Sequence, residues 1–262
     1  MRLFGVVGNP VAHSRSPLLH NALFRYLGWS DRYVRFQLEH GQEIKEVCSR
    51  YKLSGVNVTV PFKEEAYALC DRVEGIAVDI GAVNTILCNN GELIGYNTDA
   101  PGFWASLGED KPRRALLLGA GGTARALALM MRQEGVEVTV LNRSAKRLDY
   151  FRTIGVDAYD WDSFVVSRFD LVVNTTSAGL VDDELPLPQP LLTNVFDHVG
   201  RGYEVIYGKE TPFMASLKAR GIPVVDGASM LVWQAVLAQH LFTNPPLSNN
   251  EIAQLMFQAV IL

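Results

Sequence analysis

The N-terminal part of the chain carries polar side chains of the types that bind and protonate a small, oxygen-rich molecule. Lys63 follows a predicted buried strand at 56–60, and Asp99 follows a predicted hairpin at 82–95. An ammonium group can give a proton or a hydrogen bond to an oxygen on which negative charge develops, and a nearby carboxylate can orient it. The other candidate groups are hydroxyls and amides, most of them near predicted strand ends: Ser14, Ser16, Asn57, Thr59, Asn84, Thr85, Asn97 and Thr98.

Taken singly, each of these residues has an ordinary structural explanation. Ser16 could cap a helix, Asn57 could be a buried amide that the backbone satisfies, and Lys63 could lie on a solvated helix face. Taken together, the hydroxyl, amide, ammonium and carboxylate groups match a small polyhydroxylated acid. The ammonium could donate a proton outright or act mainly through its charge, and the residues leave both roles open.

A glycine-rich turn in the second half is the strongest single motif. A predicted strand at 115–118 runs directly into Gly119, Ala120, Gly121, Gly122 and Thr123, which open a predicted helix. In this context the first glycine permits the tight turn, the second lets the backbone approach a pyrophosphate, and the N–H groups at the helix start hold its oxygens. The alternative is a structural turn without a ligand, but consecutive glycines in this order favour dinucleotide binding.

The residues after the next predicted strand, 136–141, indicate which dinucleotide binds. A site for NAD usually places an acid here to bond the ribose 2′-hydroxyl. This chain instead has Asn142, Arg143 and Ser144, with Arg147 close behind. A planar, permanently charged guanidinium suits a 2′-phosphate, and cations at a helix start are otherwise unfavourable because that end is already positive. Although a solvated basic helix start is the alternative, the residues favour NADP over NAD.

Alternating strands and helices must position these groups. Predicted strands separated by helices argue for right-handed crossovers and a mostly parallel sheet, most clearly beyond the polar segment 108–114. We expect an α/β fold of two domains, an N-terminal α/β substrate domain and a Rossmann-like NADP-binding domain with a parallel sheet. The expected substrate domain is 1–101, joined by the C-terminal helices at 235–262, and the expected cofactor domain is 102–234. A further strand is predicted at 205–207 and a loop at 185–192.

The composition is that of an ordinary globular protein. The chain has 262 residues, of which 48% are hydrophobic, and a formal net charge of −4. This excludes a disordered or collagen-like chain. The charge gives no general attraction to nucleic acid or to an anionic membrane, so neither is an expected partner. Monomer and homodimer stay equally open.

Cysteine and histidine spacing argues against a metal site. Cys48, Cys70 and Cys88 are odd in number and widely spaced, which favours reduced thiols over a disulfide framework or a zinc ligand pair. The five histidines show no ligand spacing, so no metal is expected. With no leader-like or bilayer-length apolar segment, the expected location is the cytoplasm.

Ordered matches to a known family extend over essentially the whole chain. They are FGVVGNP at 4–10, HSRSP at 13–17, GVNVTVPFK at 55–63, GAVNT at 81–85, GYNTD at 95–99, the glycine turn, NRS at 142–144, NTTS at 174–177, TPF at 211–213 and the stretch from 226 to 234. In these motifs the chain resembles the shikimate dehydrogenase family. The resemblance implies reversible reduction of 3-dehydroshikimate to shikimate with NADPH, on the route to chorismate and the aromatic amino acids.

The resemblance also implies a role for each matched residue. Ser14 and Ser16 would hold the substrate carboxylate, and Lys63 with Asp99 would form the catalytic pair. Hydroxyls of the substrate would be held by Thr59, Asn84, Asp99 and Gln234, with Asn57 and Tyr207 near the ring or carboxylate. The cofactor would contact Gly119, Ala120, Gly121, Gly122, Thr123, Asn142, Arg143, Ser144, Arg147, Val205 and Gly227.

Two residues depart from the family pattern, and three other functions stay as alternatives. Glu204 stands where the family more often has Asp, and Ala100 where Gly is commoner; neither departure removes a proposed catalytic group. The alternatives are a quinate/shikimate dehydrogenase that uses NAD, a folate-linked methylene dehydrogenase of similar layout, and a non-catalytic shikimate sensor. Arg143 argues against the first, no identified folate-stacking signature supports the second, and Lys63 with Asp99 argues against the third.

Overall fold

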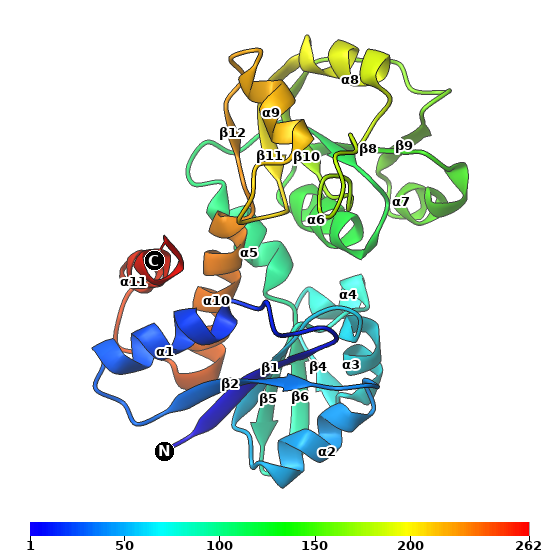
Figure 1. Cartoon of the computed structure of the whole chain (residues 1–262). Coiled ribbons are helices and arrows are strands. Elements are labelled where there is room, and N and C mark those ends of the chain that lie inside the picture. Colours follow the sequence, from blue (N-terminus) through cyan, green and yellow to red (C-terminus); the bar gives the residue numbers. More distant parts are fainter. Residues whose placement is uncertain (262) are drawn as a thin grey trace. The chain divides into compact units, whose positions relative to one another are not determined.

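The computed structural model describes residues 1–261, which fold into two compact units (Figure 1). Unit 1 contains Met1–Phe103 and the C-terminal segment that starts at Leu231, and unit 2 is Trp104–Met230. Both units are mixed α/β structures, which confirms the predicted fold class.

Unit 1 is built on a six-stranded mixed sheet with the strand order β2-β1-β3-β5-β6-β4. The first three strands in this order run parallel, whereas β5 and β6 form an antiparallel hairpin around the turn at Asn90 and Gly91. The strands are β1 (Leu3–Gly8), β2 (Arg32–Gln37), β3 (Gly55–Val58), β4 (Arg72–Val73), β5 (Thr85–Asn89) and β6 (Glu92–Tyr96).

Helices cover both faces of this sheet because its strands are apolar on both sides. Along β1, Phe4 and Val6 pack with helices α1 and α10, while Val7 points to the opposite face and packs with α2 and α3. A third apolar cluster joins α1, α10 and α11. The helices are α1 (Ser16–Tyr26), α2 (Glu43–Arg50), α3 (Lys63–Leu69), α4 (Ala77–Ile80), α5 (Asp99–Ser106), α10 (Ala228–Thr243) and α11 (Asn249–Ile261).

Unit 2 is built on a six-stranded, fully parallel sheet with the strand order β12-β11-β10-β7-β8-β9. The chain starts in the middle at β7, proceeds to one edge and then returns to add strands on the other side of β7. This arrangement puts a topological switch point between β7 and β10, where ligands of such sheets bind. The strands are β7 (Arg114–Leu118), β8 (Glu137–Asn142), β9 (Asp157–Asp160), β10 (Phe169–Asn174), β11 (Val199–Glu204) and β12 (Val224–Val225).

Two local predictions for unit 2 are wrong, one of them in part. The predicted strand at 205–207 is the segment after a strand, because β11 ends at Glu204. The glycines in β11 (Val199–Glu204) weaken its strand pattern in the sequence. Gly202 nevertheless fits inside this strand, because a Cβ at that position would meet the Leu217 side chain at 2.3 Å. The predicted loop at 185–192 is correct for 185–188 and wrong for 189–192, where helix α8 (Gln189–Phe196) begins and Pro190 occupies the first turn, in which a missing N–H costs nothing.

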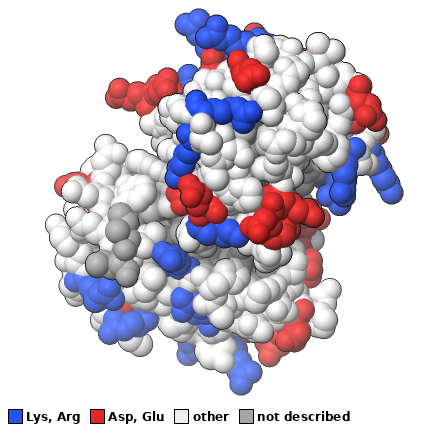
Figure 2. Space-filling model, turned by 45° about the horizontal axis from the view of Figure 1, so that its top comes forward, with Lys and Arg blue, Asp and Glu red and all other residues white. Residues whose placement is uncertain are grey.

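The remaining helices of unit 2 connect its strands. They are α6 (Gly122–Gln133), the short 3₁₀ helix η1 (Ala145–Arg147), α7 (Asp149–Thr153), α8 and α9 (Pro212–Lys218). The core on the α8 and α9 side includes Leu116, Val172 and Phe213. On the surface in view in Figure 2, basic and acidic side chains are interspersed.

Candidate functional site

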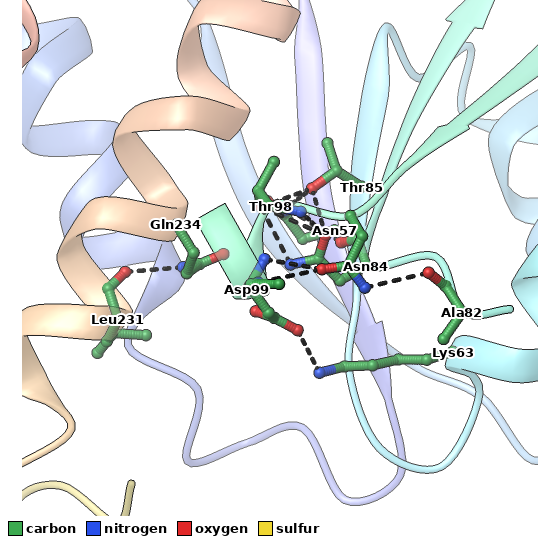
Figure 3. A network of polar contacts seen from close by, with 11 residues as sticks. Asn57, Lys63, Ala82, Asn84, Thr85, Thr98, Asp99, Leu231 and Gln234 are labelled. Carbon is green, nitrogen blue, oxygen red and sulfur yellow. Dashed lines mark hydrogen bonds and ion pairs between the residues drawn. The ribbon is translucent and has the colours of Figure 1, made fainter. Parts of the chain in front are cut away.

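Lys63 and Asp99 meet in unit 1. Lys63 is the first residue of α3 and Asp99 the first residue of α5, and Lys63 Nζ lies 2.6 Å from Asp99 Oδ2 (Figure 3). The Asn97 side chain accepts hydrogen bonds from the backbone N–H groups of Asp99 and Ala100, so it caps α5 and holds the aspartate in place. The two side chains are 31% and 18% exposed, so a bound molecule can reach both. The pair can orient an ammonium group toward a reacting oxygen.

Next to this pair, buried amides and hydroxyls form a continuous network. Asn84 Oδ1 accepts a hydrogen bond from Thr98 N at 2.7 Å, and Asn84 Nδ2 donates to Thr98 Oγ1 at 3.0 Å. Asn57 Nδ2 donates to Thr85 Oγ1 and to the Asn84 backbone carbonyl. Figure 3 shows these side chains gathered beside Asp99. Because Asn84 contacts Thr98, which directly precedes Asp99, the network supports the ion pair.

Tyr33 extends the network toward the predicted carboxylate-binding serines. Its buried phenol donates a hydrogen bond of 2.6 Å to Asn57 Oδ1. Burial raises the pKa of Tyr33 well above its usual range, and a hydrogen bond from Ser16 and one involving Asn57 oppose the rise. Both polar atoms of the Asn57 side chain therefore have partners inside the protein, and Tyr33 connects Asn57 to Ser16.

Ser14 and Ser16 lie close together, and Ser16 does not cap helix α1. Ser14 Oγ lies 3.3 Å from Ser16 Oγ. The helix begins at Ser16, and the Arg15 side chain at its N-cap position makes no cap hydrogen bond, whereas Ser14 Oγ accepts one from Ser16 N at 3.4 Å. The suggested capping role of Ser16 is wrong, because a serine that is already in the first helical turn cannot occupy the N-cap position. Its hydroxyl instead accepts a hydrogen bond from Ser14 Oγ.

The other predicted substrate residues lie in different places. Thr59 follows β3 and packs against Gly8, where a Cβ would meet Thr59 Cγ2 at 2.4 Å. Gln234 belongs to α10, donates to the Leu231 carbonyl and packs against the backbone of Gly102. Tyr207 belongs to unit 2, after β11.

A cavity of about 490 Å³ opens at the switch point of unit 2. Six of the predicted cofactor residues line it, namely Gly119, Ala120, Gly121, Asn142, Arg143 and Arg147. The ends of β7 and β8 supply these residues, and the segment after β10 supplies the opposite part of the lining with Thr175, Thr176, Ser177 and Ala178. Trp161, Leu141, Glu184, Leu185 and Pro186 complete it.

The glycine turn fits a dinucleotide. Gly119 has a φ of +102°, which favours glycine, and a Cβ there would approach Thr175 and Thr176 within about 3 Å. A Cβ at Gly121 or Gly122 would meet nothing within 4 Å, so this stretch of backbone is open to a bound group. Helix α6 begins at Gly122, and its first N–H groups suit a pyrophosphate. With two arginines on the same cavity, the donor set suits a phosphorylated dinucleotide.

Five predicted cofactor residues do not line this cavity: Gly122, Thr123, Ser144, Val205 and Gly227. Ser144 accepts a hydrogen bond from Lys146 N and caps η1. Val205 and Gly227 instead lie against each other, and a Cβ at Gly227 would come within 2.1 Å of the Val205 carbonyl oxygen. Only glycine fits at position 227 in this conformation.

The sequence interpretation assigned no role to Thr175, Thr176 and Ser177. They immediately follow β10, which the structure places next to β7, the strand before the glycine turn. The hydroxyl-rich NTTS run was the available signal. Whether this run reaches the cofactor cavity depends on the strand order of the sheet. The chain forms β8 and β9 on one side of β7 before it crosses over and places β10 on the other side.

Known proteins similar to this chain match it along its length. Residues 6–86 match the family described as shikimate dehydrogenase substrate binding domain. A shikimate dehydrogenase (NADP(+)) of Helicobacter pylori is 45% identical over 247 residues, which cover 93% of either chain. The chain belongs to the shikimate dehydrogenase family. Another member, from Aquifex aeolicus, is 38% identical and covers 90% of this chain and 89% of its own length.

Solved structures of shikimate dehydrogenases have the same fold. One from Aquifex aeolicus has a TM-score of 0.88 at 35% identity and covers 99% of this chain and 97% of its own. One from Thermus thermophilus, in complex with NADP(H) and shikimate, has a TM-score of 0.85 at 36% identity and covers 99% of this chain and all of its own. These similarities confirm the predicted family and the Rossmann-like character of the fold.

Two further findings concern membranes and metals. Within residues 1–261, every helix is too short or too polar to cross a bilayer. In the same described part, no three His, Cys, Asp or Glu side chains are grouped so that they could hold a metal ion. The three cysteines are free, and all contribute to one apolar cluster of unit 1 although they are far apart in the sequence.

Proposed function

We propose that this shikimate dehydrogenase catalyses the reversible, NADP-dependent reduction of 3-dehydroshikimate to shikimate, and that it works in the cytoplasm. The observation that carries the proposal is the similarity, over nearly the whole chain, to enzymes named for this activity and to a structure in complex with NADP(H) and shikimate. The ion pair of Lys63 and Asp99 supplies the acid–base group that reduction of a ketone requires.

On this proposal unit 1 binds the substrate. Ser14 and Ser16 hold the carboxylate, with Tyr207 and Asn57 contributing near the ring or carboxylate. Thr59, Asn84, Asp99 and Gln234 hold the hydroxyls. Two observations support this assignment. Asn84 bonds to Thr98, the residue directly before Asp99, and Tyr33 connects Asn57 to Ser16.

Unit 2 would hold the cofactor, which supplies the hydride when bound. The glycine turn would accept the pyrophosphate, and Asn142, Arg143, Ser144 and Arg147 would hold the 2′-phosphate of the adenosine. The cavity supports this assignment because the turn and both arginines line it together. Thr123, Val205 and Gly227 are proposed as further cofactor contacts on the basis of their match to the family.

The chemical step on the protein side belongs to Lys63. As the carbonyl carbon accepts hydride, negative charge develops on its oxygen, and Lys63 Nζ donates a hydrogen bond and then a proton to that oxygen. Asp99 orients the ammonium group through the bond to its Oδ2. In the oxidative direction, neutral Lys63 accepts the proton from the hydroxyl.

The decisive experiment measures turnover by absorbance with shikimate or quinate, each with NADP or NAD, and with a control that contains no substrate. We expect turnover with shikimate and NADP and only weak turnover in the other combinations. Strong turnover with quinate or NAD would identify a quinate/shikimate dehydrogenase instead. Folded protein that binds shikimate without any turnover would be a sensor and would overturn the roles of Lys63 and Asp99.

A further inference from the structure

Glu204, the last residue of β11, carries a carboxylate that is buried in unit 2 and takes no part in the chemistry described above. Its side chain has no solvent exposure. Glu204 Oε2 accepts hydrogen bonds from Asn174 Nδ2 at 2.9 Å and from Thr211 Oγ1 at 2.8 Å, and Oε1 accepts one from Ile206 N at 3.1 Å. Burial of a carboxylate is costly unless such bonds compensate it.

Every one of these three partners is a donor. The Thr211 hydroxyl accepts a hydrogen bond from Met214 N as the cap of α9, which leaves its own proton for Glu204. Burial raises the pKa of Glu204, and the bonds from Asn174, Ile206 and Thr211 oppose the rise. A carboxylate satisfies all three donors, whereas an amide of the same shape would direct an NH₂ group at one of them.

Asn174 and Thr211, two of these partners, lie at the two ends of the segment 174–179. This segment includes Thr175–Ala178, which line the cofactor cavity. At its start, Asn174 Oδ1 accepts hydrogen bonds from Thr176 N at 3.1 Å and from Thr176 Oγ1 at 2.7 Å. At its end, Gly179 packs against Thr211, and a Cβ on this glycine would lie 3.0 Å from Thr211 Cβ. Glu204 thus contacts Asn174 at the start of the segment and Thr211, which packs against its end.

We propose that Glu204 is a positioning residue for the cofactor, which it serves through Asn174 and Thr176 by holding the segment 174–179 in its binding conformation. This inference rests on the proposed function, because it takes the cavity to be the NADP site. The carboxylate itself does not line the cavity. Its loss should therefore weaken cofactor binding while leaving the shikimate residues of unit 1 unaffected.

The test is the substitution Glu204→Gln, with NADPH affinity measured by fluorescence titration in the absence of substrate. We expect the Kd for NADPH to rise about tenfold, since hydrogen bonds to a charged group are lost. The Km for shikimate at saturating cofactor should rise clearly less than the Kd for NADPH, because Tyr207 is the one proposed shikimate residue that lies in unit 2, next to Ile206. The matched control is Glu210→Gln, which removes a carboxylate of the same unit that pairs only with exposed Lys218 in the described structure, and it should leave the Kd unchanged.

A second variant approaches the same contact from the cavity side. Thr176→Val keeps the volume of the side chain and removes both the bond from Oγ1 to Asn174 Oδ1 and the bond that Oγ1 accepts from Ala178 N within the same segment. It stays informative if Glu204→Gln fails to fold. We expect this variant to raise the Kd for NADPH as well. The Kd of the double variant should lie within about twofold of the higher of the two single-variant values, because both changes break the same chain of contacts.

Three results would overturn the proposal: unchanged NADPH affinity in either folded variant, equal weakening of cofactor and shikimate binding, or fully additive losses in the double variant. Failure of the proposed function would look different, since the wild-type protein would then not bind NADPH at all.

Discussion

Lys63 Nζ and Asp99 Oδ2 are 2.6 Å apart, although the two residues begin different helices of unit 1. The first turn of a helix favours a negative charge and disfavours a positive one. The negative charge of Asp99 therefore suits the start of α5. The positive charge of Lys63 is unfavourable at the start of α3, and the carboxylate of Asp99 offsets this cost. The ion pair thus holds the Lys63 ammonium group where it can stabilise the negative charge that develops on a substrate oxygen during the proposed reaction.

Replacement of this cation should affect turnover more than binding. In Lys63→Ala we expect kcat to fall by about 10²- to 10⁴-fold with a much smaller change in the Km for shikimate, because the ammonium acts mainly on the transition state. Steady-state kinetics with shikimate and NADP measures both quantities. Lys45→Ala is the control, since Lys45 is an exposed lysine of the same unit that makes a long 3.7 Å contact to Asp71. Unchanged turnover in the Lys63 variant would remove it from the mechanism.

Arg143 should decide the preference for NADP. Arg143 lines the cavity beside Asn142, and a charged hydrogen bond from it to a 2′-phosphate would be worth about 1.5–3 kcal/mol. In Arg143→Ala we expect kcat/Km for NADP to fall by about tenfold or more while kcat/Km for NAD changes little. The ratio of the two values in parallel assays is the readout. Equal losses with both cofactors would show that Arg143 does not recognise the 2′-phosphate.

His20 should make the protein sensitive to moderate acid. This ring is fully buried in unit 1, Nδ1 lies 2.7 Å from Gln239 Oε1, and Tyr33 stacks on it with ring centroids 4.3 Å apart. Burial lowers the pKa of His20 from 6.5 to about 4, and the bond to Gln239 opposes the shift. The unfolded chain therefore binds more protons between these two values, so stability falls as the pH falls from about 6.5 toward 4.

The lost free energy of unfolding should reach about 2–3 kcal/mol near the lower pH. Urea unfolding between about pH 7 and about pH 4.5 measures it, and comparison with a variant that lacks the imidazole separates the His20 contribution from that of carboxylates that begin to titrate in this range. His20→Asn keeps a donor for Gln239 but cannot become charged, and it should lose distinctly less stability over the same range. If both proteins lose the same amount, another group is responsible.

The Tyr33 hydroxyl should matter for shikimate binding. In Tyr33→Phe the ring can still stack on His20, but Asn57 Oδ1 loses its donor and Ser16 loses a partner. Loss of such a bond is worth about 0.5–1.5 kcal/mol, so the Km for shikimate should rise by about two- to tenfold with the Km for NADP unchanged. Tyr51→Phe, at a half-exposed tyrosine of the same unit, is the control. A lowered melting temperature with an unaltered Km would assign Tyr33 a structural role only.

Local patterns in the sequence were sufficient for much of the architecture. The alternation of strands and helices, the Asn90–Gly91 hairpin turn and the glycine turn at 119–123 depend on periodicity and turn chemistry within a few residues, and the predicted α/β class was confirmed. Predictions failed at Gly202, where tertiary packing outweighs local preference, and at Pro190, where the prolines hid a helix start that tolerates them. Gly202 lies inside a strand because Leu217 occupies the space of its missing side chain, and Pro190 is in a helix because its position is the first turn.

The sequence by itself determined the kinds of groups present, including the lysine and aspartate, the serine pair and the arginine after the second strand of unit 2. Only the tertiary structure decided which of them meet. Tyr33 reaches Asn57 because β2 and β3 flank β1, and Glu204 reaches Asn174 because β11 is adjacent to β10. A buried polar group needs a partner wherever the chain can bring one, and strand order over long sequence separations, which short-range patterns do not encode, selects that partner.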